Sequence, residues 1–102
     1  MLRNPILTVL GVAYPNNVYI IGNRSIKESE DKQTVSVEIF LTAYTDASLT
    51  HEIERKKPVY KVLSGLPNND ANLLKTLYET ELLSQHPDDV MDGTALKNFS
   101  II

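Results

Sequence analysis

The stretch that decides the fold is Gln33–Tyr44, which reads QTVSVEIFLTAY. Its apolar residues recur at every second position, which is the period of a β-strand. These residues are Val35, Val37, Ile39, Leu41 and Ala43. The opposite face is polar for most of its length but carries Phe40 and Tyr44 at its far end. A strand with one continuous apolar face has to be covered by another layer, so the sequence predicts both a sheet and a covering element.

The segments before this strand predict two further strands. Ile6–Ala13 is a short apolar run, and its length, Gly11 and the flanking prolines favour a strand over a buried helix. A signal peptide is not expected, because the N-terminus has a single arginine, is interrupted by Pro5 and lacks a clear cleavage site. Val18–Ile26 follows, and Gly22 in its middle indicates a bulge or a close backbone approach. The charged stretch Lys27–Lys32 separates this segment from the central strand, so the two are expected to pair as a hairpin. With Ile6–Ala13 they would form an antiparallel meander.

The segment after the central strand leaves three alternatives open. Thr45–Lys57 is compatible with an irregular crossing, a helical turn that starts at Asp46, or a strand that begins near Leu49. The proline that follows cannot donate to a sheet, so the next strand, Val59–Leu63, is expected to begin there or to lie at an edge. Ser64–Pro67 is expected to close the β region.

The sequence pattern of residues 68–85 predicts a helix. Asn68 or Asn69 offers an N-cap, and the aspartate after them suits the positive end of the helix dipole. The helix is expected to end near Gln85, because His86 precedes a proline and is pushed out of helical geometry. Apolar residues fall at helical spacing on one face, the natural partner of the central strand: Leu73, Leu74, Leu77, Tyr78 and Leu82.

Residues 86–102 form a turn-rich C-terminal tail that ends in Phe99, Ile101 and Ile102. Such an apolar tail packs either on the sheet or on another chain. The chain as a whole is expected to be a single α+β domain of residues 1–102. We expect an antiparallel β-meander of three to four strands over residues 1–65, with one amphipathic helix packed on it.

Composition excludes several classes of protein. The 102 residues include no cysteine, which excludes disulfides and thiolate metal sites and suits a reducing cytoplasm. No apolar run reaches the roughly 18–20 residues that span a bilayer, so no membrane partner is expected. The net charge of −3 argues against a nucleic-acid partner. The short basic cluster from Arg55 to Lys61 is interpreted as a solvated strand end.

Two groups of polar residues invite a chemical interpretation. His51 lies near two glutamates, but the second histidine of the zinc-protease pattern is missing, since position 55 is arginine. His86 lies near Asp88, Asp89 and Asp92, but the alternating oxygen ligands and distal glutamate of a calcium loop are missing. The acidic group is interpreted as turn-forming residues. No catalytic, cofactor-binding or metal-binding residue is expected, and the chain is not expected to be an enzyme.

Two stretches of the chain carry a family resemblance. The strand QTVSVEIFLTAYTD is followed by a helix and an acidic segment that contain Leu77-Tyr78, Leu82-Leu83, Pro87-Asp88 and Asp89-Val90-Met91-Asp92. This order, over about residues 18–92, resembles small structural proteins of tailed bacteriophages. The resemblance implies a non-catalytic virion component, of tail or capsid, that is assembled in the host cytoplasm. Its expected partners are other copies of the chain or other virion proteins.

The leading hypothesis is therefore a structural protein that forms a homo-oligomer. The alternatives are a small cytoplasmic module that binds a ligand or a protein and, ranked last, a small enzyme that uses His51 or His86. The candidate interface residues are Phe40, Tyr44, Tyr60, Phe99, Ile101 and Ile102.

Overall fold

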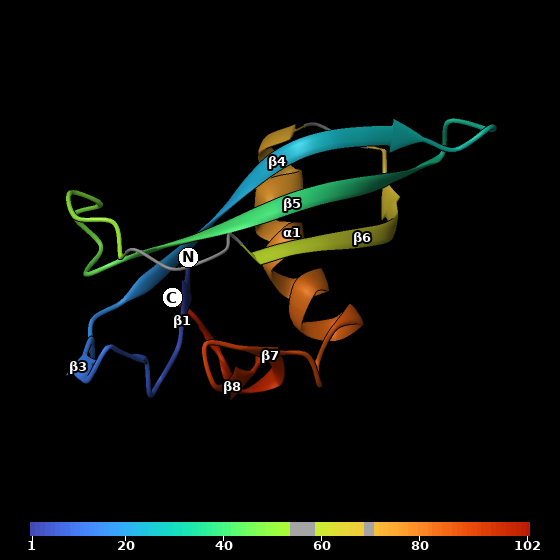
Figure 1. The fold of residues 1–102 in the computed structure, drawn as a ribbon. Helices are drawn as coiled ribbons and strands as arrows, with labels where there is room; N and C mark the ends of the chain where they lie inside the picture. Colours follow the sequence, from blue (N-terminus) through green and yellow to red (C-terminus); the bar gives the residue numbers. More distant parts are fainter. Residues whose placement is uncertain (54–58, 69–70) are drawn as a thin grey trace.

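The computed structural model describes residues 1–53, 59–68 and 71–102, with Val59 and residues 71–76 as backbone only. It shows an α+β fold, in which a five-stranded antiparallel sheet has the order β6-β5-β4-β1-β9. Helix α1 (Ala71–Gln85) lies against one face of this sheet (Figure 1). The sheet strands are β1 (Leu2–Arg3), β4 (Val18–Glu28), β5 (Thr34–Tyr44), β6 (Val59–Pro67) and β9 (Ser100–Ile101).

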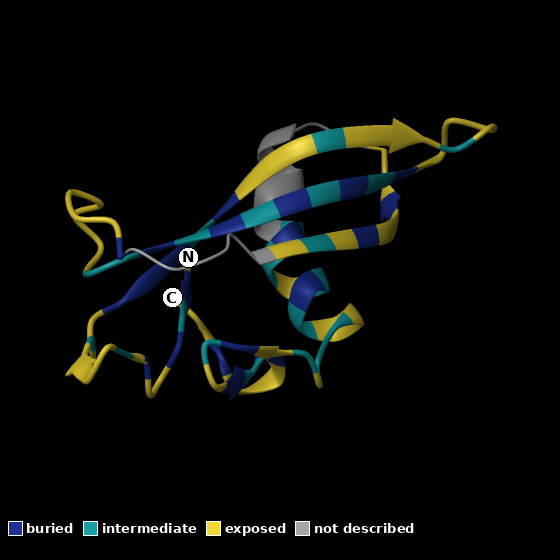
Figure 2. Cartoon of the chain, in the orientation of Figure 1, coloured by how far each residue is buried: buried dark blue, intermediate teal, exposed yellow. Residues whose placement is uncertain are grey.

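Strand β5 is the centre of the core, as its two-residue period predicts. Its inward-facing side chains are at most 2% exposed, and Figure 2 shows buried and half-buried residues alternating along it. Tyr78 and Leu82 of α1 are buried on the same side. The predicted hairpin is confirmed, since β4 and β5, of eleven residues each, pair along their length. With β6 on the other side of β5, these strands form an antiparallel meander as predicted, although its third strand is β6 and not Ile6–Ala13.

The prediction of a sheet strand at Ile6–Ala13 is wrong. This run folds back on itself as a small hairpin of β2 (Thr8–Val9) and β3 (Val12–Ala13). Its turn residues Leu10 and Gly11 have φ of 51° and 80°, the left-handed geometry of a tight two-residue turn. The place beside β4 is taken by β1 instead, with Leu2 opposite Tyr19.

Strand β6 runs further than the sequence predicts, through Pro67. The extension includes a bulge, because Val37 pairs with Leu63 whereas Val35 pairs with Leu66. Gly65 lies in this bulge with a φ of 70°, a conformation that glycine adopts without a steric cost. Ser64–Pro67 therefore continues the strand and does not close the β region.

The segment between β5 and β6 is irregular as far as it is described, which agrees with the first of the three alternatives. In residues 45–53, Asp46 Oδ1 accepts a hydrogen bond from Ser48 N, and Leu49 has a φ of 58°. A single bridge joins Tyr44 to Glu52. The rest of the segment, residues 54–58, lies outside the described residues.

Helix α1 ends at Gln85, as the proline two residues later predicts. Asn68 donates from Nδ2 to Lys32 O at 2.9 Å and from its backbone to Gln33 O at 3.1 Å, so it fastens the start of the helix segment to the β4–β5 turn. Of the other predicted residues, Asn69, Asp70 and the side chains of Leu73 and Leu74 lie outside the described residues.

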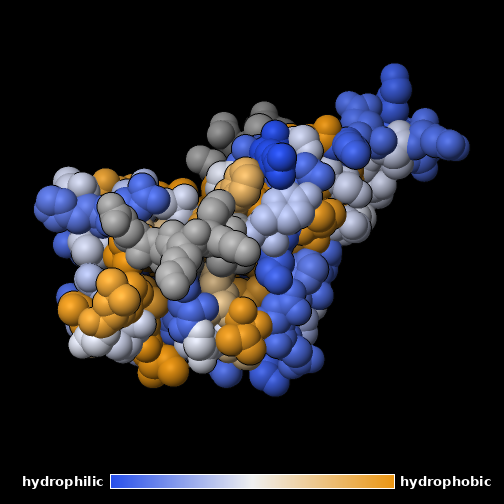
Figure 3. All heavy atoms as spheres, in the orientation of Figure 1, coloured by the Kyte–Doolittle hydropathy of each residue, from blue (hydrophilic) through white to orange (hydrophobic). Residues whose placement is uncertain are grey.

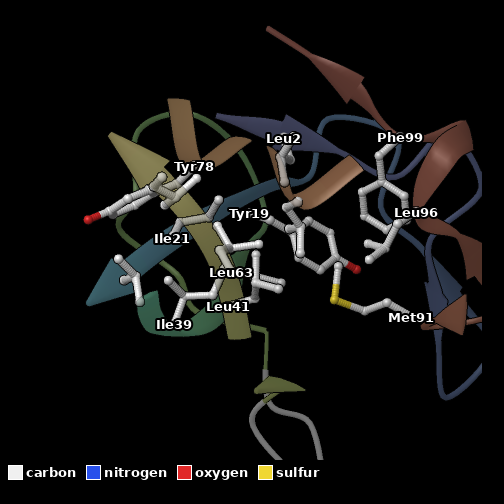
Figure 4. Close-up of a cluster of buried hydrophobic side chains, with 14 of the residues drawn as sticks. Leu2, Tyr19, Ile21, Ile39, Leu41, Leu63, Tyr78, Met91, Leu96 and Phe99 are labelled. Carbon is white, nitrogen blue, oxygen red and sulfur yellow. The ribbon is translucent and has the colours of Figure 1, made fainter. Parts of the chain in front are cut away.

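The C-terminal tail packs on the sheet, which is the first of the two alternatives given for this segment. It forms a second small hairpin, β7 (Val90–Met91) and β8 (Thr94–Ala95), then a turn of 3₁₀ helix, η1 (Leu96–Asn98), and strand β9 at the sheet edge. The ring of Phe99 meets Tyr19 edge-on at 5.2 Å between centroids. Figure 4 shows Met91, Leu96 and Phe99 gathered around Tyr19.

Candidate interaction surfaces on the open sheet face and the apolar hairpin

The face of the sheet that points away from α1 carries a pair of aromatic rings. Phe40 on β5 lies directly opposite Tyr60 on β6, and their ring centroids are 5.9 Å apart at 59°. On the other side of Phe40 the residue in register is Gly22 of β4, which has no side chain. The two rings therefore share one stretch of surface with space beside them.

Arg24 covers this pair of rings. Its guanidinium carbon lies 5.4 Å from the centroid of Phe40 and 5.6 Å from that of Tyr60. The register of β4 against β5 shifts between Asn23 and Ser25, so Arg24 is the extra residue of a β-bulge. A bulge changes the direction of a side chain, and here it brings the cation over both rings. Each such contact is worth about 0.5–1 kcal/mol at an exposed position.

The carboxylate of Glu38 accepts a hydrogen bond from the Tyr60 hydroxyl. The hydrogen bond from the Tyr60 hydroxyl, and then that from Ser25, keep the pKa of the Glu38 carboxyl below its usual value of 4.5. The Ser25 Oγ–Glu38 Oε2 distance is 2.9 Å. The same bond to Glu38 raises the pKa of Tyr60. We call Arg24, Ser25, Glu38, Phe40 and Tyr60 the aromatic patch; its polar members fix the rings in place.

A second exposed surface lies on the β2–β3 hairpin. Ile6, Leu10 and Val12 are 67%, 99% and 53% exposed, and we call these three residues the apolar hairpin. The hairpin lies at the lower left of the view in Figure 3, where apolar side chains gather, whereas the β4–β5 turn at the upper right is hydrophilic. Below the exposed residues, Leu7 is buried and its carbonyl accepts a hydrogen bond from Tyr14 N at 2.9 Å. The hairpin is thus anchored in the fold while its tip stays in solvent.

The other candidate interface residues lie apart from the aromatic patch. Tyr44 is on the same face as Phe40 but four residues further along β5, where it is half-buried beside Glu52. Phe99 is in the core and contributes no surface. Ile101 and Ile102 are about half exposed at the β9 edge.

The histidines and aspartates considered as possible chemical groups do not converge on one site. His86 Nδ1 is 3.3 Å from Asp89 Oδ2, and Lys61 Nζ donates to that same oxygen at 2.6 Å. Asp88 pairs with a lysine at 3.2 Å, and Asp92 accepts a hydrogen bond from the Tyr19 hydroxyl at 2.6 Å. His51 is exposed and Glu54 lies outside the described residues, as do Arg55, Lys56 and Lys57. Within the described ranges no three His, Asp or Glu side chains are grouped as metal ligands.

Leu10 and Arg24 are candidate surface residues that were not predicted from the sequence. The pattern for the first was present, since Leu10-Gly11 separates two pairs of strand-forming residues by the two positions that a tight hairpin turn needs. No pattern marked Arg24, because its position over the rings depends on where the bulge falls. Gly22 indicated a bulge, and the structure places the bulge two residues later.

In the part of the chain that is described, no helix is long and apolar enough to cross a membrane. No family model, no curated protein and no solved structure matches the chain.

Proposed function

We propose that the chain is a non-catalytic structural subunit of a tailed-bacteriophage particle, of tail or capsid, which assembles with other copies of itself. The resemblance of β5 and the α1 segment to small structural proteins of tailed bacteriophages supports the bacteriophage origin. The single observation that carries the assembly role is the apolar hairpin.

The apolar hairpin presents large side chains where a soluble monomer gains nothing from them. Single exposed leucines are common on protein surfaces. Leu10, however, is almost fully exposed in a left-handed backbone conformation, which costs a residue with a Cβ about 1–2 kcal/mol. Asn, Asp and Gly are the residues that such turns favour. A leucine there is expected when a partner buries it, which is worth about 1.5–3 kcal/mol for a complete side chain.

The aromatic patch supports the same role. Tyr and Arg are the residue types that dominate the binding energy of protein interfaces. In this patch the rings of Phe40 and Tyr60 are already held by Arg24 and Glu38. Side chains that are ordered before binding lose little conformational entropy when a partner arrives. The patch therefore suits a specific contact with a polar rim.

Hydrogen exchange measured by mass spectrometry at low and high protein concentration tests this function. Peptides that cover residues 6–13 are expected to become protected as concentration rises. Peptides from the β4–β5 turn, residues 29–33, serve as the internal control and are expected to exchange equally fast at both concentrations. Exchange of residues 6–13 that is independent of concentration would contradict assembly through the apolar hairpin.

A further inference from the structure

The outer edge of β6 is occupied by side chains from the end of α1. Gln85 Oε1 accepts a hydrogen bond from Ser64 N at 3.0 Å, and Gln85 Nε2 donates to Ser64 O at 2.8 Å. His86 Nε2 lies 2.8 Å from Val62 O and donates to it. The Gln85 amide thus makes the pair of bonds that a neighbouring strand would make. Without these side chains, the β6 edge would be a template for pairing with another chain.

The spacing of these bonds shows which residues of β6 face outward. In an antiparallel pair the backbone groups of alternate residues point to the same side. Since Ser64 and Val62 face away from β5, Tyr60 faces away as well. The outward groups are therefore evenly spaced and symmetric about Val62. Tyr60 stands two residues before this centre and Ser64 two residues after it.

We propose that the β6 edge is a pairing surface for β6 of a second copy of this chain, and that Gln85 and His86 keep it closed. The two strands would run antiparallel about a two-fold axis at Val62. This inference goes beyond the proposed function and does not depend on a virion origin.

The exposed apolar side chain of Val62 is what favours a second copy over an unrelated strand. A copy paired about a two-fold axis at Val62 places Ser64 opposite Tyr60, Val62 opposite Val62, and Tyr60 opposite Ser64. Each of these three pairs can exchange two backbone hydrogen bonds. Val62 is 39% exposed on the open face, so the axis would bring together two apolar side chains that are now in solvent. The aromatic patches of the two copies would then lie on one continuous sheet.

The closing contacts have to break before the edge can pair. The Gln85 amide lies where the backbone of an added strand would run, and it must leave Ser64 before a second copy can pair there. Gln85 is exposed, so its replacement does not disturb the core. Removal of its amide, alone or with the His86 ring, is expected to open the edge.

A single cysteine at the axis reports this pairing, because the chain contains no cysteine of its own. Directly opposed residues of an antiparallel pair have Cα atoms about 5.5 Å apart, which is within reach of a disulfide. Val62→Cys would be oxidised with a glutathione buffer in three full-length backgrounds: Gln85 and His86 intact, Gln85→Ala, and Gln85→Ala with His86→Ala. Lys27→Cys, on the exposed part of β4, is the control for random collision.

The expected result is a disulfide-linked dimer that forms at least ten times faster in both opened backgrounds than in the intact one. Lys27→Cys is expected to react equally slowly in all of them. Equal rates for Val62→Cys with and without Gln85 would overturn the proposal, since a contact through the open face would not depend on Gln85. A folded Gln85→Ala chain whose introduced thiol stays reduced, or one that forms irregular aggregates, would overturn it as well.

Discussion

The side chain of Asn17 pairs with the backbone of Asn4 as a neighbouring strand would. Asn17 Oδ1 accepts a hydrogen bond from Asn4 N at 2.9 Å, and Asn17 Nδ2 donates to Asn4 O at 2.7 Å. Nδ2 also donates to Tyr14 O at 2.7 Å, and both asparagines are fully buried. On the other side, Asn4 Oδ1 accepts a hydrogen bond from Thr94 Oγ1 at 2.7 Å. This network joins the N-terminal segment, the start of β4 and the C-terminal hairpin.

Asn17→Ala is expected to lower the free energy of unfolding by about 2–4 kcal/mol, because it removes the partner of three backbone groups beneath the surface. Asn17→Asp is expected to be worse, since it replaces the amide donor by an acceptor that faces two carbonyl oxygens. Urea unfolding followed by circular dichroism measures both effects. Asn16→Ala, at the exposed neighbouring position, is the matched control and should change stability by less than about 0.5 kcal/mol. A loss at Asn17 no larger than that at Asn16 would contradict the network.

Two buried tyrosines predict opposite effects of the same substitution. The Tyr78 hydroxyl is buried and has no hydrogen-bond partner among the residues that the structure describes, and burial raises its pKa. Tyr78→Phe is therefore expected to stabilise the chain by about 1 kcal/mol. The Tyr19 hydroxyl donates to the Asp92 carboxylate at 2.6 Å, so Tyr19→Phe is expected to cost about 1.5–3 kcal/mol. Thermal melts of the two variants compare them directly, and a fall in Tm for Tyr78→Phe would be the contrary result.

Replacement by alanine is expected to affect stability differently at two of the glycines. Gly93 has a φ of 82° in the β7–β8 turn, so Gly93→Ala is expected to cost about 1–2 kcal/mol of strain. Gly22 has an ordinary strand conformation, and a Cβ there would meet no atom within 4 Å. Gly22→Ala is expected to be neutral or to stabilise by up to about 1 kcal/mol, through the reduced entropy of the unfolded chain. Equal losses at both positions, measured by urea unfolding, would not fit this backbone.

The Lys61–Asp89 ion pair is expected to make the free energy of unfolding depend on pH in the acid range. The hydrogen bond and the charge of Lys61 lower the pKa of the Asp89 carboxyl from its usual value of 3.8. A lowered folded-state pKa means that the pair stabilises the fold fully above 3.8, and that this contribution is lost as the pH falls through the folded pKa. Asp89→Asn is expected to flatten this part of the stability profile.

Urea midpoints measured from about pH 6 to about pH 2.5 test the acid prediction. Lys61→Met, which removes the partner of the carboxylate, should flatten the profile in the same way. The double variant should add nothing further. An acid profile that is unchanged in Asp89→Asn would show that this pair does not carry the dependence.

The central strand, its hairpin with β4 and the end of α1 follow from local sequence. The alternation around Ile39 sets the buried face of β5, and the proline after His86 stops the helix. The short strands could not be predicted in the same way, because two residues such as Leu2–Arg3 carry no period. Their places depend on the Asn17 side chain and on where the C-terminal tail docks, which are contacts between distant parts of the chain.

The candidate surfaces were predictable to a smaller extent. Phe40 and Tyr60 are both candidates from the sequence, but the sequence places Tyr44, and not Tyr60, beside Phe40. That the two rings form a pair under Arg24 depends on strand register and on a bulge, and neither is written in local sequence. Phe99 was predicted as an interface residue from its place near the C-terminus, but the β7–β8 hairpin and η1 carry it into the core.

The solution mass of the intact chain, measured by light scattering after a sizing column over a hundredfold range of concentration, decides whether the chain assembles with itself. We expect a discrete oligomer for the natural sequence and a folded monomer for Leu10→Ser combined with Phe40→Ser. Val90→Ser, an exposed apolar position outside both surfaces, should keep the oligomer. A natural sequence that stays monomeric at every concentration, or an oligomer that survives the loss of Leu10 and Phe40, would contradict the proposed assembly.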